Sequence, residues 1–136
     1  MTCVRQGSLV EMTTDGGDVW VQAVETLGPG DRVRDPLTGR AVTVVTTLVH
    51  ETGGIWPLVQ YLGLTADFAQ FVHVADRWVA AGDVGTRSMQ LCPCIYAIVV
   101  SDGKTACVDG VTCCVHTPTD LASADTATPV GPRFWT

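Results

Sequence analysis

Short runs of apolar and β-branched residues, separated by glycine-containing turns, constrain the fold of this chain most. The longest run covers 40–49, and the most apolar covers 94–100. Asp15-Gly16-Gly17, Asp102-Gly103 and Asp109-Gly110 can supply the positive φ angles of tight hairpin turns. We therefore predict an all-β domain of many short strands. The expected strands are 8–12, 18–23, 31–34, 40–49, 55–62, 71–74, 78–80, 94–100, 105–108 and 111–115.

Composition excludes several classes of protein. With 136 residues, of which 46% are apolar and 16% charged, the chain can form one globular domain with a substantial core. A formal charge of -6 argues against a surface for nucleic acid or anionic membranes. No apolar run approaches the roughly 20 residues that a membrane span needs. We expect a monomer with no nucleic-acid partner and no membrane span.

Glycine and proline indicate where elements end. Gly28-Pro29-Gly30 follows a predicted single helical or 3₁₀ turn at 24–27, and Thr117-Pro118 follows the last predicted strand. The remaining residues are rich in Thr, Ala, Asp and Pro, a composition typical of linkers. We predict a β domain over residues 1–117 and an irregular tail or linker over 118–136.

Cys3 has a chemical option that interior cysteines rarely have. Its sulfur can attack the carbonyl of the preceding residue, Thr2, and convert that peptide bond into a thioester, with the thiolate as the nucleophile. The simpler alternative is that Cys3 is a loose thiol near the chain terminus.

The other five cysteines lie in the last third of the chain: Cys92, Cys94, Cys107, Cys113 and Cys114. The pair in Cys92-Pro93-Cys94 is too closely spaced for the usual zinc motif, and no second pair at metal spacing follows. Several of these cysteines are therefore expected to be small buried apolar residues. A metal or redox module built from Cys92, Cys94, Cys113, Cys114 and His116 remains an alternative.

Five segments of residues 3–117 carry a recognisable pattern. They are Cys3 with Gly7, Ser8 and Val10, then 23–33, 64–68, 95–100, and finally 109–111 with Val115-His116. In this order they resemble the blocks of the Hint superfamily, the self-processing domains of hedgehog proteins and inteins. The segment 23–33, Ala-Val-Glu-Thr-Leu-Gly-Pro-Gly-Asp-Arg-Val, is the most specific match. The ending 110–113, with the segment around Trp78, is most similar to the Hint domains beside von Willebrand A domains (Vint).

The resemblance implies a pseudo-twofold β horseshoe and single-turnover chemistry. Cys3 would carry out an N-to-S acyl shift on the Thr2–Cys3 bond, and water, a thiol, an amine or an alcohol would resolve the thioester. The protein partner would be a segment upstream of Cys3 in the same chain, and no cofactor is implied. Thr65 would orient the scissile peptide, and His116 matches the penultimate histidine of inteins.

Three positions depart from the family pattern. In the family, the segment that corresponds to 64–68 carries a Thr-x-x-His block, whose histidine donates to the nitrogen of the scissile bond. Phe68 occupies the place of this histidine, and a hydrocarbon ring cannot transfer a proton. Asp67 and His73 are expected to face the opposite way to position 68, because each lies an odd number of residues from it and an odd offset along a strand changes the face. Ala97 stands where inteins commonly carry an acidic residue. Thr117 replaces an asparagine whose cyclisation would release the C-terminal flank, so we predict cleavage or transfer rather than splicing.

The candidate catalytic residues are therefore Cys3, Thr65, Asp67, His116 and the position of Phe68. Because Phe68 and Ala97 lack the expected chemistry, a catalytically inactive Hint fold that serves as an interaction or structural module is a further alternative.

The first prediction concerns metal content. The purified protein should hold no tightly bound metal, because the cysteine spacing lacks two proper ligand pairs. Elemental analysis is the measurement, and about one zinc ion per chain would contradict this expectation and favour the metal module.

Overall fold

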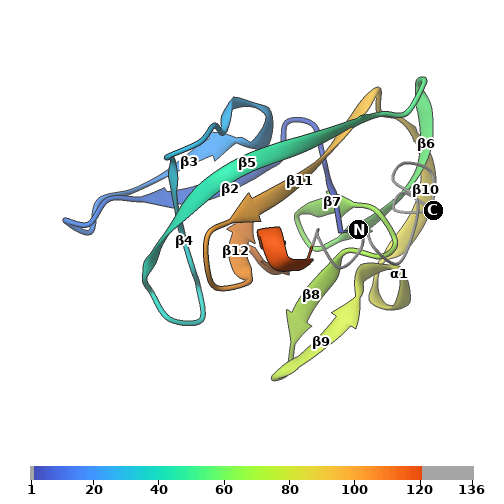
Figure 1. The fold of residues 1–136 in the computed structure, drawn as a ribbon. Helices are drawn as coiled ribbons and strands as arrows, with labels where there is room; N and C mark the ends of the chain where they lie inside the picture. Colours follow the sequence, from blue (N-terminus) through green and yellow to red (C-terminus); the bar gives the residue numbers. More distant parts are fainter. Residues whose placement is uncertain (1, 121–136) are drawn as a thin grey trace.

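The computed structural model describes residues 2–120, and its regular structure is almost entirely β (Figure 1). The predicted all-β class is confirmed. The two short helical elements are η1 (Val24–Thr26) and α1 (Ala81–Val84). The strands are β1 (Val4–Arg5), β2 (Leu9–Thr13), β3 (Val19–Ala23), β4 (Arg32–Arg34), β5 (Ala41–Glu51), β6 (Ile55–Tyr61), β7 (Leu64–Ala66), β8 (Phe71–Val74), β9 (Arg77–Ala80), β10 (Thr86–Leu91), β11 (Cys94–Val100), β12 (Thr105–Val108) and β13 (Val111–Cys114).

The strands form one hydrogen-bonded path in the order β10-β6-β7-β1-β11-β5-β4-β2-β12-β13-β8-β9, with β3 paired to β2. All named pairs are antiparallel. The long pair of β5 and β11 runs across the molecule and links the β2–β3–β4 end to the β6–β10 end (Figure 1). This arrangement explains how segments far apart in sequence meet at β1.

Strands with strong apolar patterns lie where the sequence predicts them. The predictions for β8, β11 and β12 match the observed bounds, and the helical turn is η1. The sequence did not indicate β1, β7 or β10. β10 pairs along its whole length with β6, yet its Met89 and Leu91 are exposed, so no buried face gives it a pattern that can be recognised.

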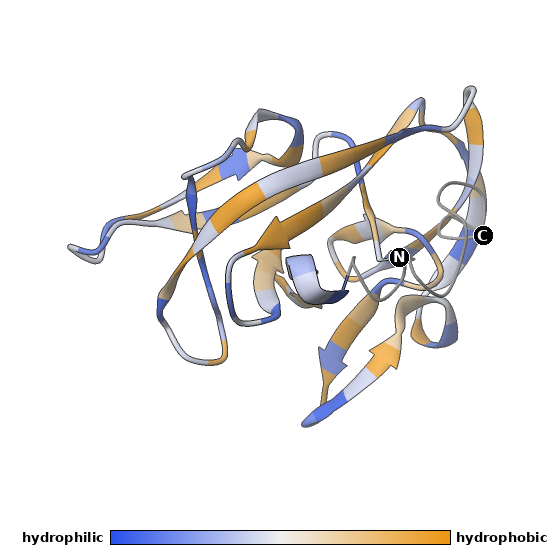
Figure 2. Ribbon diagram, viewed as in Figure 1, coloured by the Kyte–Doolittle hydropathy of each residue, from blue (hydrophilic) through white to orange (hydrophobic). Residues whose placement is uncertain are grey.

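The core has two parts. The larger cluster includes Val10, Val33 and Val44, and β11 contributes Ile98 and Val100 to it; β11 accordingly stands out as apolar in Figure 2. The smaller cluster consists of Cys3, Leu58, Cys92, Ile95 and Ala97, with Leu48 and Trp56 packed against it. Because Cys3 is completely buried in this cluster, the alternative of a loose terminal thiol is wrong.

The β domain closes just after β13. The Thr117 amide donates to the Asp120 carboxylate, and the Asp120 amide donates to the Thr117 hydroxyl. Most of the predicted tail, 121–136, lies outside the described residues. Within residues 2–120, none of the helices has the length and apolar character that crossing a membrane requires.

A second prediction follows from the packing of Gly85, which ends α1. A Cβ atom at this position would overlap Val59 Cγ1 and lie 2.6 Å from the Gln60 carbonyl oxygen. Gly85→Ala should therefore reduce the free energy of unfolding by about 1–3 kcal/mol through overpacking. Urea unfolding measures the change. Gly28→Ala is the matched control, because a Cβ there meets no atom within 4 Å; equal stability of the two variants would contradict the packing described here.

Candidate active site

The Thr2–Cys3 peptide lies at the start of β1, a two-residue strand inserted between β7 and β11. Val4 pairs with Ala66 of β7 on one side and with Tyr96 of β11 on the other. The Asp67 amide donates to the Cys3 carbonyl oxygen at 3.0 Å, which extends the β7 pairing back to Cys3. Thr2 is itself buried, with 8% of its surface exposed. The peptide bond that would be cleaved is thus held inside the fold by strands from distant parts of the sequence.

The imidazole of His116, a residue far from Thr2 in the sequence, lies against this peptide. The Nε2 atom of His116 lies 3.3 Å from the Thr2 carbonyl oxygen, 3.1 Å from the Thr2 amide nitrogen and 3.2 Å from the Thr2 hydroxyl. The Thr2 carbonyl carbon is the atom that the Cys3 sulfur would attack. The candidate His116 is therefore beside the scissile bond, although the residues are separated by more than a hundred positions.

Backbone pairing fixes the position of His116. Its amide donates to the Ile98 carbonyl at 3.0 Å, and its carbonyl accepts from the Val100 amide at 2.8 Å. On the other side of the peptide, the Thr2 hydroxyl donates to the Cys114 carbonyl oxygen at 3.1 Å. The edge of β11 and the end of β13 thus hold the imidazole and its target in register.

Gln70 is a buried polar residue that sequence analysis did not identify. Its side-chain amide donates to the carbonyl oxygens of Phe71 and Cys114, each at 2.9 Å. The Cys114 carbonyl is the same group that accepts from Thr2, so Gln70 helps to position the scissile residue. A cavity of about 10 Å³ lies beside Thr2 and Gln70, which is close to the minimum space for one water molecule. A polar residue just before a short strand gives no sequence signal of such a role.

The protonation state of His116 follows from its burial. Desolvation lowers the pKa of the imidazole below its ordinary value of 6.5, and the hydrogen bond with the Thr2 backbone opposes part of that change. The ring is therefore neutral at pH 7. One neutral nitrogen cannot both accept from the Thr2 amide and donate to the Thr2 carbonyl, so the tautomer decides which contact is a hydrogen bond. The tautomer that carries hydrogen on Nε2 donates to the carbonyl oxygen.

Cys3 is a thiol in its resting state. Burial raises the pKa of Cys3 well above its ordinary value, and the carboxylate charge of Asp67 raises it further. Burial also raises the pKa of Asp67, while the amide of Ala69 and the indole of Trp56 offset part of this rise. The contact with the Trp56 indole falls short of a full hydrogen bond, since Trp56 Nε1 has no hydrogen-bond partner among the atoms described. The Asp67 charge thus acts on Cys3, whereas Phe68, the next residue, packs against the larger core.

The other candidates of the Thr-x-x-His block occupy different surroundings. Thr65 is buried on β7, two residues before Asp67 and on the same face of the sheet. Phe68 packs against the larger core, and the Arg87 guanidinium lies 4.5 Å from the centre of its ring. His73 lies on β8, where its ring contacts that of Trp78 at 4.9 Å between centroids. Of these residues, only Thr65 and Asp67 share the face of the sheet on which Cys3 lies.

The late cysteines are distributed over separate elements. Cys92 is buried in the smaller core and donates to the Cys94 carbonyl at 3.2 Å, whereas Cys113 belongs to the larger core. Burial raises the pKa of Cys113 beyond the ordinary thiol range, which keeps it protonated. In the part of the chain that the structure describes, no three His, Cys, Asp or Glu side chains lie close enough to hold a metal ion.

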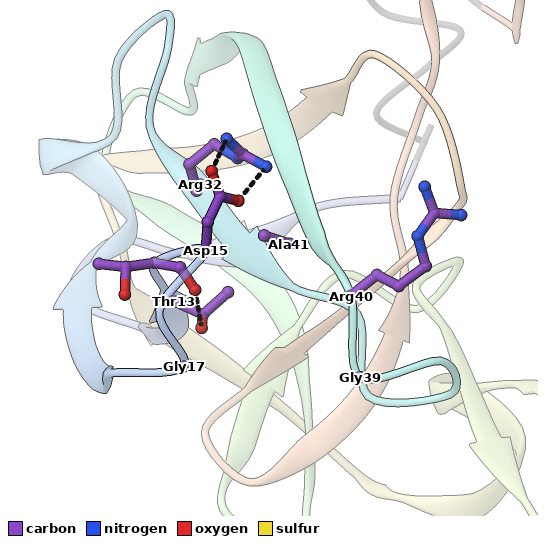
Figure 3. Close-up of a pocket in the computed structure, with 8 residues that line it drawn as sticks. Thr13, Asp15, Gly17, Arg32, Gly39, Arg40 and Ala41 are labelled. Carbon is purple, nitrogen blue, oxygen red and sulfur yellow. Dashed lines mark hydrogen bonds and ion pairs between the residues drawn. The ribbon is translucent and has the colours of Figure 1, made fainter.

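A polar cavity of about 390 Å³ lies elsewhere, between the β2–β3 turn and the start of β5. Figure 3 shows Arg32 paired with Asp15 there, while Arg40 points away from the pair. The Arg32–Asp15 distance is 2.8 Å. Because none of the candidate catalytic residues lines this cavity, it does not take part in the chemistry of Cys3.

Solved structures of inteins have the same fold. No protein-family model and no curated protein matches the chain. The solution structure of a bacterial intein-like domain from Clostridium thermocellum matches with a TM-score of 0.61 and 22% identity, covering 85% of this chain and 99% of that one. The crystal structure of a DnaB intein from Synechocystis matches with a TM-score of 0.63 and 8% identity over the same shares. A variant of the gp41-1 intein matches with a TM-score of 0.60 and 9% identity, again over 85% and 99%.

These likenesses cover nearly the whole of each intein structure, so the described chain has the all-β fold of inteins. At such low identity the likeness concerns the fold alone. The roles of individual residues must be argued from the geometry at Thr2 and Cys3.

The third prediction concerns the pH dependence that His116 contributes. Because its folded pKa is lowered, the unfolded chain binds more protons at mildly acidic pH. The stability contribution is therefore complete above the ordinary value of 6.5 and is lost as the pH falls towards the folded pKa. Urea unfolding at about pH 7.5 and about pH 5.5 should show this loss in the parent and a smaller loss in His116→Gln. An NMR titration of His116 with its midpoint above 6.5 would contradict the assignment.

Proposed function

We propose that this chain, which has the fold of inteins, breaks its own Thr2–Cys3 peptide bond. The observation that carries the proposal is the position of His116 Nε2, 3.3 Å from the carbonyl oxygen of Thr2, beside a Cys3 that is completely buried. A buried nucleophile adjacent to its target carbonyl, with an imidazole at that carbonyl oxygen, is an arrangement suited to acyl transfer.

The proposed reaction is an N-to-S acyl shift. The Cys3 thiol loses its proton, and its sulfur forms a bond to the Thr2 carbonyl carbon. His116 donates a hydrogen bond to the oxygen, on which negative charge develops in the tetrahedral intermediate. The bond from that carbon to the Cys3 nitrogen then breaks, and the nitrogen gains a proton to become an amine. The product is a thioester between Thr2 and the Cys3 side chain.

An external nucleophile completes the reaction. Water, a thiol, an amine or an alcohol attacks the thioester carbonyl and releases the segment upstream of Cys3. The small cavity of about 10 Å³ beside Thr2 suits water without rearrangement, whereas a larger nucleophile must displace neighbouring side chains. The substrate is thus protein in the same chain, and no cofactor takes part.

Cleavage or transfer at the N-terminal bond is favoured over splicing. Thr117 follows His116, and its hydroxyl cannot cyclise onto the main chain as an asparagine amide does. Instead, the Thr117 hydroxyl accepts from the Asp120 amide and helps to close the domain. Among Hint domains, we place the chain nearest to the Vint type on the segment 110–113 and the surroundings of Trp78. We further propose that it acts as a monomer and binds no nucleic acid.

A second candidate function has an observation in its favour. The ring of Phe68 packs against the core beneath Arg87, so the place of the block histidine serves packing in this chain. Together with Ala97, this is the arrangement expected of an inactive Hint fold retained as an interaction or structural module. The two functions differ in whether a fused partner is released.

The fourth prediction separates them. A fusion with a folded protein upstream of Thr2 should release that protein when a strong thiol is added, and mass spectrometry should locate the break at Thr2–Cys3. Cys3→Ala should abolish the release, because it removes the sulfur that attacks the Thr2 carbonyl. Since Cys3 packs in the smaller core, thermal unfolding must show that the variant is folded.

Cys107→Ala is the matched control, as Cys107 lies half-buried on β12 and outside the site. It should cleave like the parent. Release that persists in Cys3→Ala would remove the nucleophile assignment, and a folded parent that never cleaves would favour the inactive module.

A further inference from the structure

The proposed reaction needs a group that takes the proton from Cys3. Burial raises the pKa of this thiol, so hardly any thiolate forms spontaneously at neutral pH. The two family positions that could supply proton transfer hold Phe68 and Ala97, neither of which can accept a proton. His116 contacts Thr2, on the carbonyl side of the bond. A proton acceptor on the Cys3 side must therefore come from another position.

The register of β1 shows which residues face Cys3. Val4 pairs with Tyr96 and Arg5 with Ile95, so one position earlier on the antiparallel pair Cys3 lies opposite Ala97. On the other side Val4 pairs with Ala66, so Cys3 lies opposite Asp67. The hydrogen bond of 3.0 Å from the Asp67 amide to the Cys3 carbonyl agrees with this register. Cys3 is thus flanked by Ala97 on one neighbouring strand and by Asp67 at the end of the other.

Directly opposed residues of an antiparallel pair point to the same face, with Cβ atoms about 4.5–5.5 Å apart. The carboxyl group of Asp67 is therefore on the side of the sheet where the Cys3 sulfur lies. It is also buried, with 5% of its surface exposed. The effect of the Asp67 charge on the Cys3 pKa is consistent with this proximity.

The carboxyl group is held in a defined position. Its Oδ1 atom accepts from the Ala69 amide at 3.0 Å, and the Gln70 amide donates to the Asp67 carbonyl at 3.1 Å. These two bonds form the turn that follows β7 and fix the side chain within it. The charges that act on Asp67 are those of the chain's N-terminal amino group and of His50 on β5, and the Asp67 charge in turn acts on Cys3.

We propose that Asp67 is the proton-transfer group of the acyl shift, in place of the acidic residue that inteins commonly carry at the position of Ala97. The carboxylate takes the thiol proton of Cys3, and the sulfur attacks the Thr2 carbonyl carbon. When the carbon–nitrogen bond breaks, the resulting carboxylic acid gives that proton to the Cys3 nitrogen. The proton passes from sulfur to nitrogen, and Asp67 returns to its starting state. This inference depends on the proposed self-cleavage.

The experiment tests whether the position of the carboxyl group matters. It moves this group from residue 67, on one side of Cys3, to residue 97, on the other side. In the thiol-cleavable fusion, Asp67→Asn keeps the side-chain oxygen that accepts from Ala69 but removes the proton acceptor. Its cleavage rate should fall by about a hundredfold, as is usual for loss of general acid–base catalysis. The double variant Asp67→Ala with Ala97→Asp places a carboxyl group on the opposite neighbour of Cys3 and should recover a measurable part of the lost rate.

The matched control is Asp83→Asn, which removes an exposed carboxylate on α1 and should not change the rate. The pH profile is a further measurement that a purely structural role would not change. Cleavage in the parent should rise with pH as Asp67 loses its proton and again as the thiols ionise, and Asp67→Asn should keep only the second rise. Unfolding curves establish that each variant is folded.

The outcomes distinguish this proposal from the proposed function. If Asp67→Asn is folded and cleaves like the parent while Cys3→Ala does not cleave, the role of Asp67 is refuted and self-cleavage stands. If Asp67→Asn fails to fold, the double variant provides the test. A double variant that folds but does not cleave refutes the proposed role of Asp67. If the folded parent does not cleave, both proposals fail together.

Discussion

The site depends on the insertion of β1 between β7 and β11. Two residues of strand would not be stable alone, but Val4 pairs on both sides and buries its side chain in the core. This double pairing puts Cys3 into a sealed apolar cluster and puts the Thr2 carbonyl at the ring of His116. Any change in the register of β1 by one residue would turn the Cys3 side chain to the other face of the sheet.

Burial favours the neutral forms of the groups around the bond. It keeps Cys3 protonated and His116 neutral, so the resting site holds few charges at neutral pH. In the proposed reaction, the Cys3 thiol must therefore lose its proton before its sulfur can attack. The same low-polarity surroundings strengthen a hydrogen bond to a developing oxyanion.

The sequence predicts the fold class well because apolar alternation and glycine turns are local signals. The bounds of β8, β11 and β12 follow from such signals. Cys3 is identified as the candidate nucleophile from its place near the start of the chain and from the resemblance to the Hint superfamily. The proximity of Asp67 to Cys3 could not be predicted, because it depends on pairing between β7 and a strand about sixty positions away. The approach of His116 to Thr2 likewise requires the register of β13 and β11.

Thr2 and Val4 are held by different parts of the fold, and the Thr2–Cys3 bond lies between them. The Thr2 side is held by the Cys114 carbonyl and by His116, whereas the other side is held by strand pairing of Val4. If the bond breaks, the departing segment loses the contacts of Thr2 with His116 and with the Cys114 carbonyl, whereas the strand pairing of Val4 remains. Release would then leave an intact domain whose first residue is a buried cysteine, and the cleavage would be irreversible.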